Sequence, residues 1–273
     1  MADTFVAPKF VTDDGEVAFQ RPVAGVTPTS SAHLTTKAYV DAIEVGVVTL
    51  QSETLSVLFD DMLWASLPNN GWTSGSSGTG TNPTSVATGV DSTERAQGVV
   101  KLTTGSTSTG RGSIYQCLDS ILLGQGASFE FEARLYLSNL STDSDEYVVH
   151  FGLMDGADGG SEPVDSVAFA YRGSSDGDFW TLQTRSNDSE TKTITATEPS
   201  TSAFSVFKIV VAADGSSAEF FIDKVSKGVH TTNIPTGAGR QTGIGLRIAK
   251  TVGTSERTIL VDWVRIRISG AVR

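Results

Sequence analysis

The alternation of apolar and polar residues after residue 126 is the feature that most constrains the fold of this chain. In residues 127–137, ASFEFEARLYL, every second side chain is apolar. Five apolar side chains share one side of this extended segment: Phe129, Phe131, Ala133, Leu135 and Leu137. Because a period of two belongs to a strand with one buried face, we predict a half-buried β-strand here.

Seven further apolar runs follow at close intervals. We predict strands at residues 147–153, 166–172, 179–184, 204–211, 218–223, 243–249 and 258–268. Asp-Gly turn signals lie between some of these runs, at Asp155-Gly156, Asp176-Gly177 and Asp214-Gly215. No helical pattern intervenes, so the predicted fold class is mainly β, an antiparallel β-sandwich of the jelly-roll type or a related one.

The last predicted strand changes its apolar phase. Val261 and Val264 lie on opposite sides of a regular strand, and Asp262 shares a side with Val264 and Ile266. We therefore predict a β-bulge, or burial on both sides, between residues 261 and 264. Trp263 is interpreted as a residue of the core or of the space between two sheets.

Residues 1–32 are polar and contain prolines at positions 8, 22 and 28, spaced too closely for a helix of useful length. We interpret this segment as an extended N-terminal attachment arm. Within it, the dipeptide Asp14-Gly15 separates Val11 from the alternating Val17 and Phe19. That pattern predicts a β-hairpin inside the arm.

Residues 33–54 have a different pattern, which predicts a short helical oligomerisation segment. Thr35 or Thr36 can cap the helix. Apolar and small residues then recur at steps of three and four, as in a heptad seam: Tyr39, Ile43, Val47, Leu50, Thr54 and Val57. Gly46 and neighbouring β-branched residues make an isolated helix marginal, so we expect association between copies of the chain. The alternative is a single helix packed on the domain that follows.

Residues 69–93 are rich in Gly, Ser, Thr and Asn, a composition that alone is typical of a linker. The flanks of this tract are of another kind, with Leu58 to Asp61 and Trp64 before it and VVKLTTG after it. We interpret the tract as long loops among the first strands of a jelly-roll domain that spans residues 55–273.

Composition excludes several classes of protein. The net charge is −11 and the basic residues are scattered, which argues against a nucleic-acid partner. The single cysteine, Cys117, excludes an intrachain disulfide and is interpreted as a small buried residue. The first residues lack a signal peptide and no run of 18 apolar residues occurs, so we expect synthesis in a cytoplasm and no membrane insertion.

No catalytic motif stands out, and the sequence predicts a protein that is not an enzyme, with no catalytic residue. The E-x-D-x-x-E pattern of jelly-roll glycoside hydrolases is missing, and Glu130 and Glu132 are interpreted as solvated residues of an outer face. No G-x-S-x-G elbow occurs. The three histidines, His33, His150 and His230, lie far apart in the sequence.

Two sets of polar residues are candidates for ligand binding. Acidic clusters could supply oxygen ligands for Ca²⁺, the one cofactor considered, with Asp155, Asp158 and Asp176 as the candidate ligands. The alternative is that Asp and Gly serve tight turns there, and no EF-hand pattern occurs. For carbohydrate, Trp180 could stack on a sugar beside three polar residues: Asp178, Arg185 and Asn187. Trp180 shares a face with Leu182, so a core position is the alternative.

Two parts of the chain resemble known families. The segment RPVAGVTPTSSAHLTTKAYVD resembles the junction of tailed-phage tail-fibre and collar-type proteins, which reads H-x-T-T-K-x-Y-V-D. The matching residues are His33, Thr35, Thr36, Lys37, Tyr39, Val40 and Asp41. Residues 55–273 resemble a concanavalin A-like jelly roll, of the laminin G or glucanase type, through residues 59–72, 207–235 and 250–266. In that family the middle stretch is a strand, a Gly turn, a strand and an exit loop.

These resemblances imply a phage virion structural protein, located in the virion: a homotrimeric fibre or appendage. The arm would attach to other virion proteins, the helix would join three chains, and the β domain would bind a host surface polysaccharide or a neighbouring virion component. One alternative is a capsid-decorating protein without receptor binding. Another is a glycan-degrading enzyme on the same fold, which needs two carboxylates roughly 5 to 9 Å apart facing one cleft.

Overall fold

The computed structural model describes residues 10–13, 16–19, 56–62, 71–78, 84–86, 98–156 and 161–270. The chain divides into two units, residues 1–51 and 52–273. In the first unit, β1 (Phe10–Asp13) and β2 (Glu16–Phe19) pair antiparallel, with Asp13 opposite Glu16. The predicted hairpin with Asp14-Gly15 as its connection is therefore confirmed.

The predicted oligomerisation residues and junction motif lie outside the described residues. These are Tyr39, Ile43, Val47 and Leu50, and His33, Thr35, Thr36, Lys37 and Asp41. They remain predictions, as do the boundaries of the attachment arm and the helical segment. None of the described residues forms a helix long and apolar enough to span a membrane.

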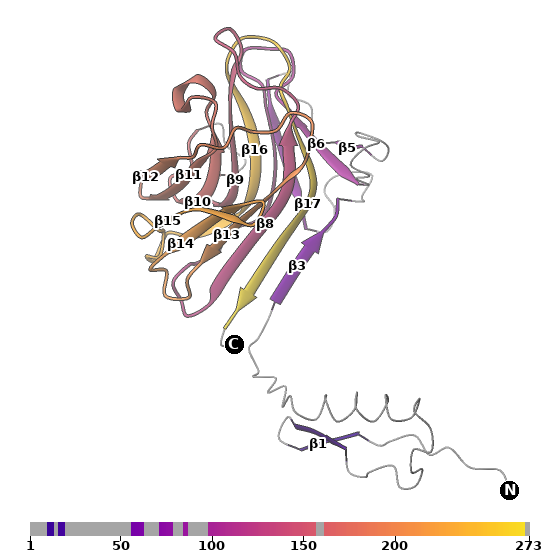
Figure 1. Ribbon diagram of the computed structural model, residues 1–273, viewed down its shortest axis with the longest axis vertical. Coiled ribbons are helices and arrows are strands. Elements are labelled where there is room, and N and C mark those ends of the chain that lie inside the picture. The colour runs from indigo at the N-terminus through magenta and orange to yellow at the C-terminus, as the bar shows by residue number, and fades with distance from the viewer. Residues whose placement is uncertain are drawn as a thin grey trace, which may run out of the picture. The chain divides into compact units, whose positions relative to one another are not determined.

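The second unit consists of two antiparallel sheets that face each other (Figure 1). The first has seven strands in the order β12-β11-β10-β9-β16-β7-β4. Their bounds are β4 (Thr73–Ser77), β7 (Arg111–Ile121), β9 (Glu146–Met154), β10 (Ser166–Tyr171), β11 (Thr181–Ser186), β12 (Ser189–Ile194) and β16 (Thr242–Val252). A short 3₁₀ helix, η1 (Gly173–Asp176), follows β10.

The second sheet has eight strands. Seven follow the order β15-β14-β13-β8-β17-β6-β5, and β3 pairs with the later part of β17. Their bounds are β3 (Ser56–Asp60), β5 (Thr84–Val86), β6 (Val99–Thr103), β8 (Ser128–Leu137), β13 (Ser205–Val211), β14 (Ala218–Ile222), β15 (Val225–His230) and β17 (Thr258–Ser269). The predicted fold class, an antiparallel β-sandwich, is confirmed.

The core lies between the two sheets and is rich in aromatic rings. All five apolar residues of the predicted first strand, from Phe129 to Leu137, are buried in it. Phe151 of one sheet meets Phe207 of the other with ring centroids 4.9 Å apart in an edge-on arrangement. Burial of each such ring contributes about 1.5 to 3 kcal/mol, so this aromatic layer is a major source of stability.

The predicted bulge in the last strand is confirmed, with a consequence that the sequence interpretation missed. The register of β17 against β8 shifts between Val261 and Trp263, so Asp262 is the extra residue. Val261 and Val264 therefore both face the core, and Trp263 turns to the outer face, where it is half-buried. The interpretation of Trp263 as a core residue is wrong.

Three other interpretations from the sequence are wrong. Residues 73–77, taken as part of a loop tract, form β4, because their backbone pairs with β7 at the edge of the sheet. Residues 225–230, expected in an exit loop, form β15, which pairs with β14. Cys117 is exposed rather than buried. It has a φ of +54° in the irregular part of β7, where the regular alternation of sides is interrupted.

Candidate functional site

The structure separates the residues that the sequence grouped as a sugar site. Trp180 is 2% exposed and its ring packs edge-on against Phe207 in the core, with centroids 4.9 Å apart. Its faces are not available to a sugar, so the core alternative holds and the stacking role is corrected. Asp178 accepts a hydrogen bond of 2.7 Å from the hydroxyl of Tyr171. This pair fixes the end of a buried tyrosine and presents no sugar-binding surface.

The other two members of that group also have structural partners. The backbone N–H of Asn187 donates to Asp165 Oδ1 at 2.9 Å, and Asn187 adopts a φ of +52° in the turn between β11 and β12. Arg185 lies on the outer face of β11, where its Nη1 is 3.4 Å from Glu162 Oε2. Trp180 and Arg185 therefore face opposite sides of one sheet.

The predicted calcium ligands do not converge either. Asp155 accepts a hydrogen bond of 3.1 Å from the backbone N–H of Asp165, and burial raises its pKa. Asp176 accepts from Lys192 Nζ at 2.7 Å and from Thr181 Oγ1 at 2.8 Å. Asp158 lies outside the described residues. In the described part of the chain no three His, Cys, Asp or Glu side chains gather around a point where a metal ion could sit.

Arg185 and Asp176 belong to a larger ion network on the outer face of the seven-stranded sheet. At its centre is the carboxylate of Glu162, which comes from the segment before β10. Its Oε2 lies 2.9 Å from His150 Nε2 and 3.2 Å from Arg172 Nη2. Arg172 also contacts Asp176 and Glu190. Burial alone raises the pKa of Glu162, but the contacts with His150 and Arg172 outweigh it and hold that pKa well below its usual range.

A buried cation lies beneath this centre. Arg247 of β16 is almost fully buried, and its Nε is 3.4 Å from His150 Nδ1. Because a guanidinium can only donate, Nδ1 is the acceptor and the ring proton sits on Nε2, toward Glu162. Burial lowers the pKa of His150 to about 4, with the charge of Arg247 acting in the same direction. The imidazole is therefore neutral at neutral pH.

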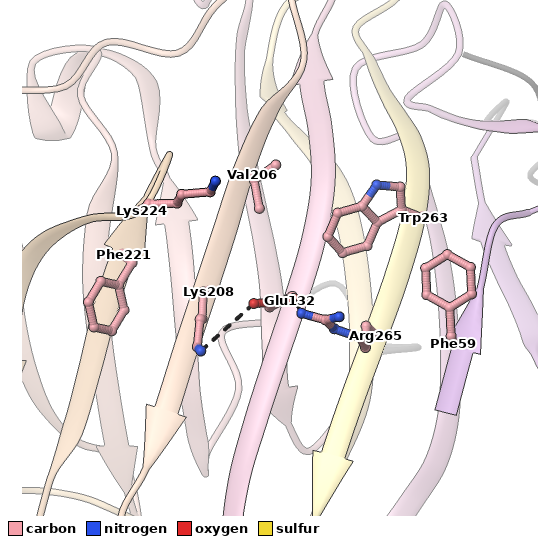
Figure 2. A pocket seen from close by; sticks show the side chains of 8 residues that line it. All are labelled: Phe59, Glu132, Val206, Lys208, Phe221, Lys224, Trp263 and Arg265. Carbon is pink, nitrogen blue, oxygen red and sulfur yellow. Dashed lines mark hydrogen bonds and ion pairs between the residues drawn. The ribbon is translucent and has the colours of Figure 1, made fainter. Parts of the chain in front are cut away.

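The outer face of the eight-stranded sheet carries a groove instead, with a volume of about 470 Å³ (Figure 2). Eight side chains line it: Phe59, Glu132, Val206, Lys208, Phe221, Lys224, Trp263 and Arg265. All of these residues belong to the second unit of the chain, and they come from five different strands and one turn.

Strand register explains why these residues meet. Phe59 is paired with Arg265, Arg265 with Glu132, Glu132 with Lys208, and Lys208 with Phe221. Partners directly opposite each other point to the same face of a sheet, so the five side chains form one straight row. With strands roughly 4.8 Å apart, the row spans roughly 19 Å. An aromatic ring stands at each end, and three charged groups of alternating sign lie between.

The end of the row at Phe59 is open to solvent. Phe59 is 57% exposed, and its ring centroid lies 6.1 Å from that of Trp263. Figure 2 shows this pair across the charged groups from Phe221. At the other end, the turn between β14 and β15 has positive φ at both Asp223 and Lys224, as a two-residue hairpin turn requires. That turn brings Lys224 to the groove.

The charged middle of the groove is a ladder of ion pairs. Glu132 pairs with Arg265 and lies 3.8 Å from Lys208 Nζ. Glu130, two residues earlier, lies 2.9 Å from Lys208 Nζ and 3.8 Å from Arg267 Nη1. Burial alone raises the pKa of Glu130, but Lys208 and the arginines lower it overall. A glycosidase needs one carboxylic acid with a raised pKa, and Glu130 has the opposite shift.

Comparisons with known proteins agree with this architecture. Residues 95–262 match a protein family described as SO2946-like, C-terminal domain. The structure of SO2946 from Shewanella oneidensis MR-1, a protein of unknown function, is 12% identical, with a TM-score of 0.56 over 92% of this chain and 99% of that chain. No curated protein matches the chain.

Two further solved structures share the fold. An endo-1,3-β-glucanase from Streptomyces sioyaensis is 15% identical, with a TM-score of 0.52 over 80% of this chain and 97% of that chain. The carbohydrate recognition domain of Emp46p in its potassium-bound form is 9% identical, with a TM-score of 0.50 over 78% of this chain and 96% of that chain. The predicted concanavalin A-like jelly roll, the fold of lectins and glucanases, is thereby confirmed.

Proposed function

The chain belongs to the SO2946-like C-terminal domain family, and from that premise we propose that it binds carbohydrate in the groove of the eight-stranded sheet. The observation that carries the proposal is the pair formed by the exposed Phe59 and the half-buried Trp263 at the end of a row of charged groups. Large exposed aromatic residues beside convergent polar groups are typical of a binding surface. The carbohydrate-recognising neighbour with the same fold supports a sugar as the ligand.

The chemistry of the groove suits an oligosaccharide. The C–H faces of a sugar ring pack on aromatic rings, and its hydroxyl groups can accept from Lys208 and Arg265 and donate to Glu132. The row spans roughly 19 Å, which is longer than a single sugar unit. We therefore expect a chain of several sugars, lying across the strands from the Phe59 end to the Phe221 end.

We propose that the groove binds oligosaccharide without hydrolysing it. Glu130 and Glu132 are two carboxylates on one strand, but each is held by cations, and Glu130 has a lowered pKa. The lowered pKa of Glu130 supports binding without cleavage, because glycoside cleavage requires a protonated carboxylic acid. We propose no metal requirement, since the groove already supplies its own charges. A released reducing end after incubation with bound oligosaccharide would overturn this part of the proposal.

The wider role that we propose is attachment within a phage virion. The support is the junction motif of residues 33–41 and the heptad-like seam that follows it. In this role the arm docks on other virion proteins, three chains associate, and the groove binds a host surface polysaccharide. Capsid decoration without receptor binding is the second candidate. Light scattering tests the trimer: the full chain is expected at three times the monomer mass, and a monomer would contradict the fibre.

The groove is tested by removing its aromatic rings. Trp263→Ala and Phe59→Ala are each expected to weaken oligosaccharide binding at least tenfold in isothermal titration, after a glycan array has identified the ligand. The matched control is Ile194→Ala, because Ile194 is 46% exposed and lies on the other sheet. The affinity of Ile194→Ala for the oligosaccharide should equal that of the unaltered protein. Unchanged affinity in both aromatic variants would show that sugar binding, if present, occurs elsewhere.

A further inference from the structure

In the ion network on the seven-stranded sheet, the donors and the central acceptor come from different parts of the fold. Its donors are held on neighbouring strands and at the end of one: His150 on β9, Arg172 after β10, and Gln183 and Arg185 on β11. The carboxylate they surround, Glu162, belongs to the segment before β10 and its side chain is 38% exposed. The donors are thus fixed by the sheet, while the acceptor can turn toward solvent.

The contacts resemble those of a bound carboxylate. Glu162 Oε2 lies 3.4 Å from Arg185 Nη1 and 3.5 Å from Gln183 Nε2, in addition to its contacts with His150 and Arg172. Its other oxygen, Oε1, accepts from Arg172 Nε at 3.4 Å. Arg172 therefore contacts both oxygens through two guanidinium nitrogens, as arginine commonly does with carboxylates.

The charges of the network indicate which charge the group at its centre carries. Among the described residues, the network contains the cations Arg172, Arg185, Lys192 and Arg247. The carboxylates other than Glu162 are Asp176, Asp188 and Glu190. His150 is neutral, and Arg111 and Asp155, which also act on Arg247, offset each other. Without Glu162 the network lacks one negative charge, which is that of a single carboxylate.

Two buried polar atoms of this sheet lack a hydrogen-bond partner among the described residues. Gln183 is fully buried, and its Oε1 receives no hydrogen bond from the described residues, while its Nε2 donates to Glu190 at 3.0 Å. Ser166, which is paired with Arg185 on the neighbouring strand, is also buried, and its hydroxyl has no hydrogen-bond partner within the described part of the chain. Buried polar atoms are normally satisfied by protein or by water, so these two are available to the hydroxyl groups of a ligand.

We propose that this cradle, formed by His150, Arg172, Gln183 and Arg185, is a second binding site that takes the carboxylate of a uronic acid residue. Glu162 occupies it as an internal substitute. A uronate enters when the Glu162 side chain rotates outward, and its carboxylate then receives the same donors. The site is independent of the groove, since it lies on the outer face of the other sheet.

Removal of the internal carboxylate tests this site. Glu162→Ala is expected to bind a galacturonate trimer at least tenfold more tightly than the unaltered protein, as measured by isothermal titration. A matching glucose trimer should show no gain. The double variant Glu162→Ala, Arg185→Ala should lose the gain. Glu256→Ala is the control and should change affinity less than threefold, because that carboxylate pairs with Lys101 of the eight-stranded sheet at 2.8 Å.

A second variant covers the case in which Glu162→Ala does not fold. Glu162→Gln keeps the shape of the side chain and should still bind uronate at least threefold more tightly, because the competing charge is gone. Equal affinity of the Gln variant and the unaltered protein would overturn the proposal, as would an equal gain for glucose or in Glu256→Ala. Trp263→Ala serves to separate the two sites: it should leave uronate binding in the cradle unchanged.

Discussion

The two outer faces of the sandwich both carry rows of charged residues, but they use them differently. On the seven-stranded sheet the charges surround a buried arginine and a carboxylate from a preceding segment, and they satisfy one another. On the eight-stranded sheet the ladder of Glu130, Glu132, Lys208 and Arg265 lies between the exposed ring of Phe59 and the half-buried ring of Phe221. Burial, rather than the number of charges, therefore decides how much an ionic face contributes to the stability of the fold.

The largest expected contrast concerns two tryptophans. Trp180→Ala should lower the free energy of unfolding by about 3 to 5 kcal/mol, because it leaves a cavity among Phe151, Tyr171 and Phe207. Trp263→Ala should lower it by about 1 kcal/mol, because that ring is only half-buried on the outer face. Urea denaturation measures both. Equal losses would mean that the groove tryptophan is part of the structural core.

A smaller contrast separates two arginines. Arg172, whose side chain is 12% exposed, neutralises Glu162, Asp176 and Glu190 together, and Arg172→Ala should cost about 3 kcal/mol. Arg265 is more exposed and pairs at a solvated surface, so Arg265→Ala should cost less than about 1 kcal/mol. Urea denaturation of the two variants and the unaltered protein measures both losses. A loss at Arg265 as large as that at Arg172 would remove the distinction between the faces.

The smallest effect is a dependence on pH between 6.5 and 5. Burial lowers the pKa of His150 to about 4, below its unfolded value of about 6.5, so the unfolded chain binds a proton first as the pH falls. Stability is complete above pH 6.5 and should fall by about 2 kcal/mol by pH 5. His230, whose pKa burial also lowers, acts in the same direction. The lowered pKa of Glu162 contributes only below about pH 4.5.

The variant His150→Gln isolates this effect. It should reduce the slope of unfolding free energy against pH between 6.5 and 5, whatever its effect at pH 7. Urea titrations at four pH values in this range suffice. An unchanged slope would assign the dependence to His230, which lies 3.0 Å from Thr184 Oγ1 and from Thr193 Oγ1.

Local patterns predicted the strands well where one face of a strand is buried and the other is solvated. The segment around Phe131 is such a case, and the phase change at Asp262 correctly predicted a bulge. The edge strand β4 was missed because a sequence of small polar residues becomes a strand only through its pairing with β7. Strand propensity depends on such neighbours, and a single sequence does not contain them.

The candidate groove could be predicted only in part. An extra residue at Asp262 reverses the alternation, so the predicted bulge already implied that Trp263 leaves the core. The row from Phe59 to Phe221 could not be foreseen, because it depends on the order β3-β17-β8-β13-β14, which joins segments from both ends of the domain. Likewise, Arg185 was identified as a ligand-binding residue without its neighbour Glu162, which lies 23 residues earlier in the chain.

The pairing of β3 with β17 has a mechanical consequence. β3 is the first strand of the β domain after the N-terminal unit, so any tension from an anchored N-terminus enters the domain through this strand. Five residue pairs, from Ser56 opposite Ile268 to Asp60 opposite Val264, hold it against the last strand. Phe59 lies within that ladder. A pull strong enough to detach β3 would also remove Phe59, and with it one wall of the groove.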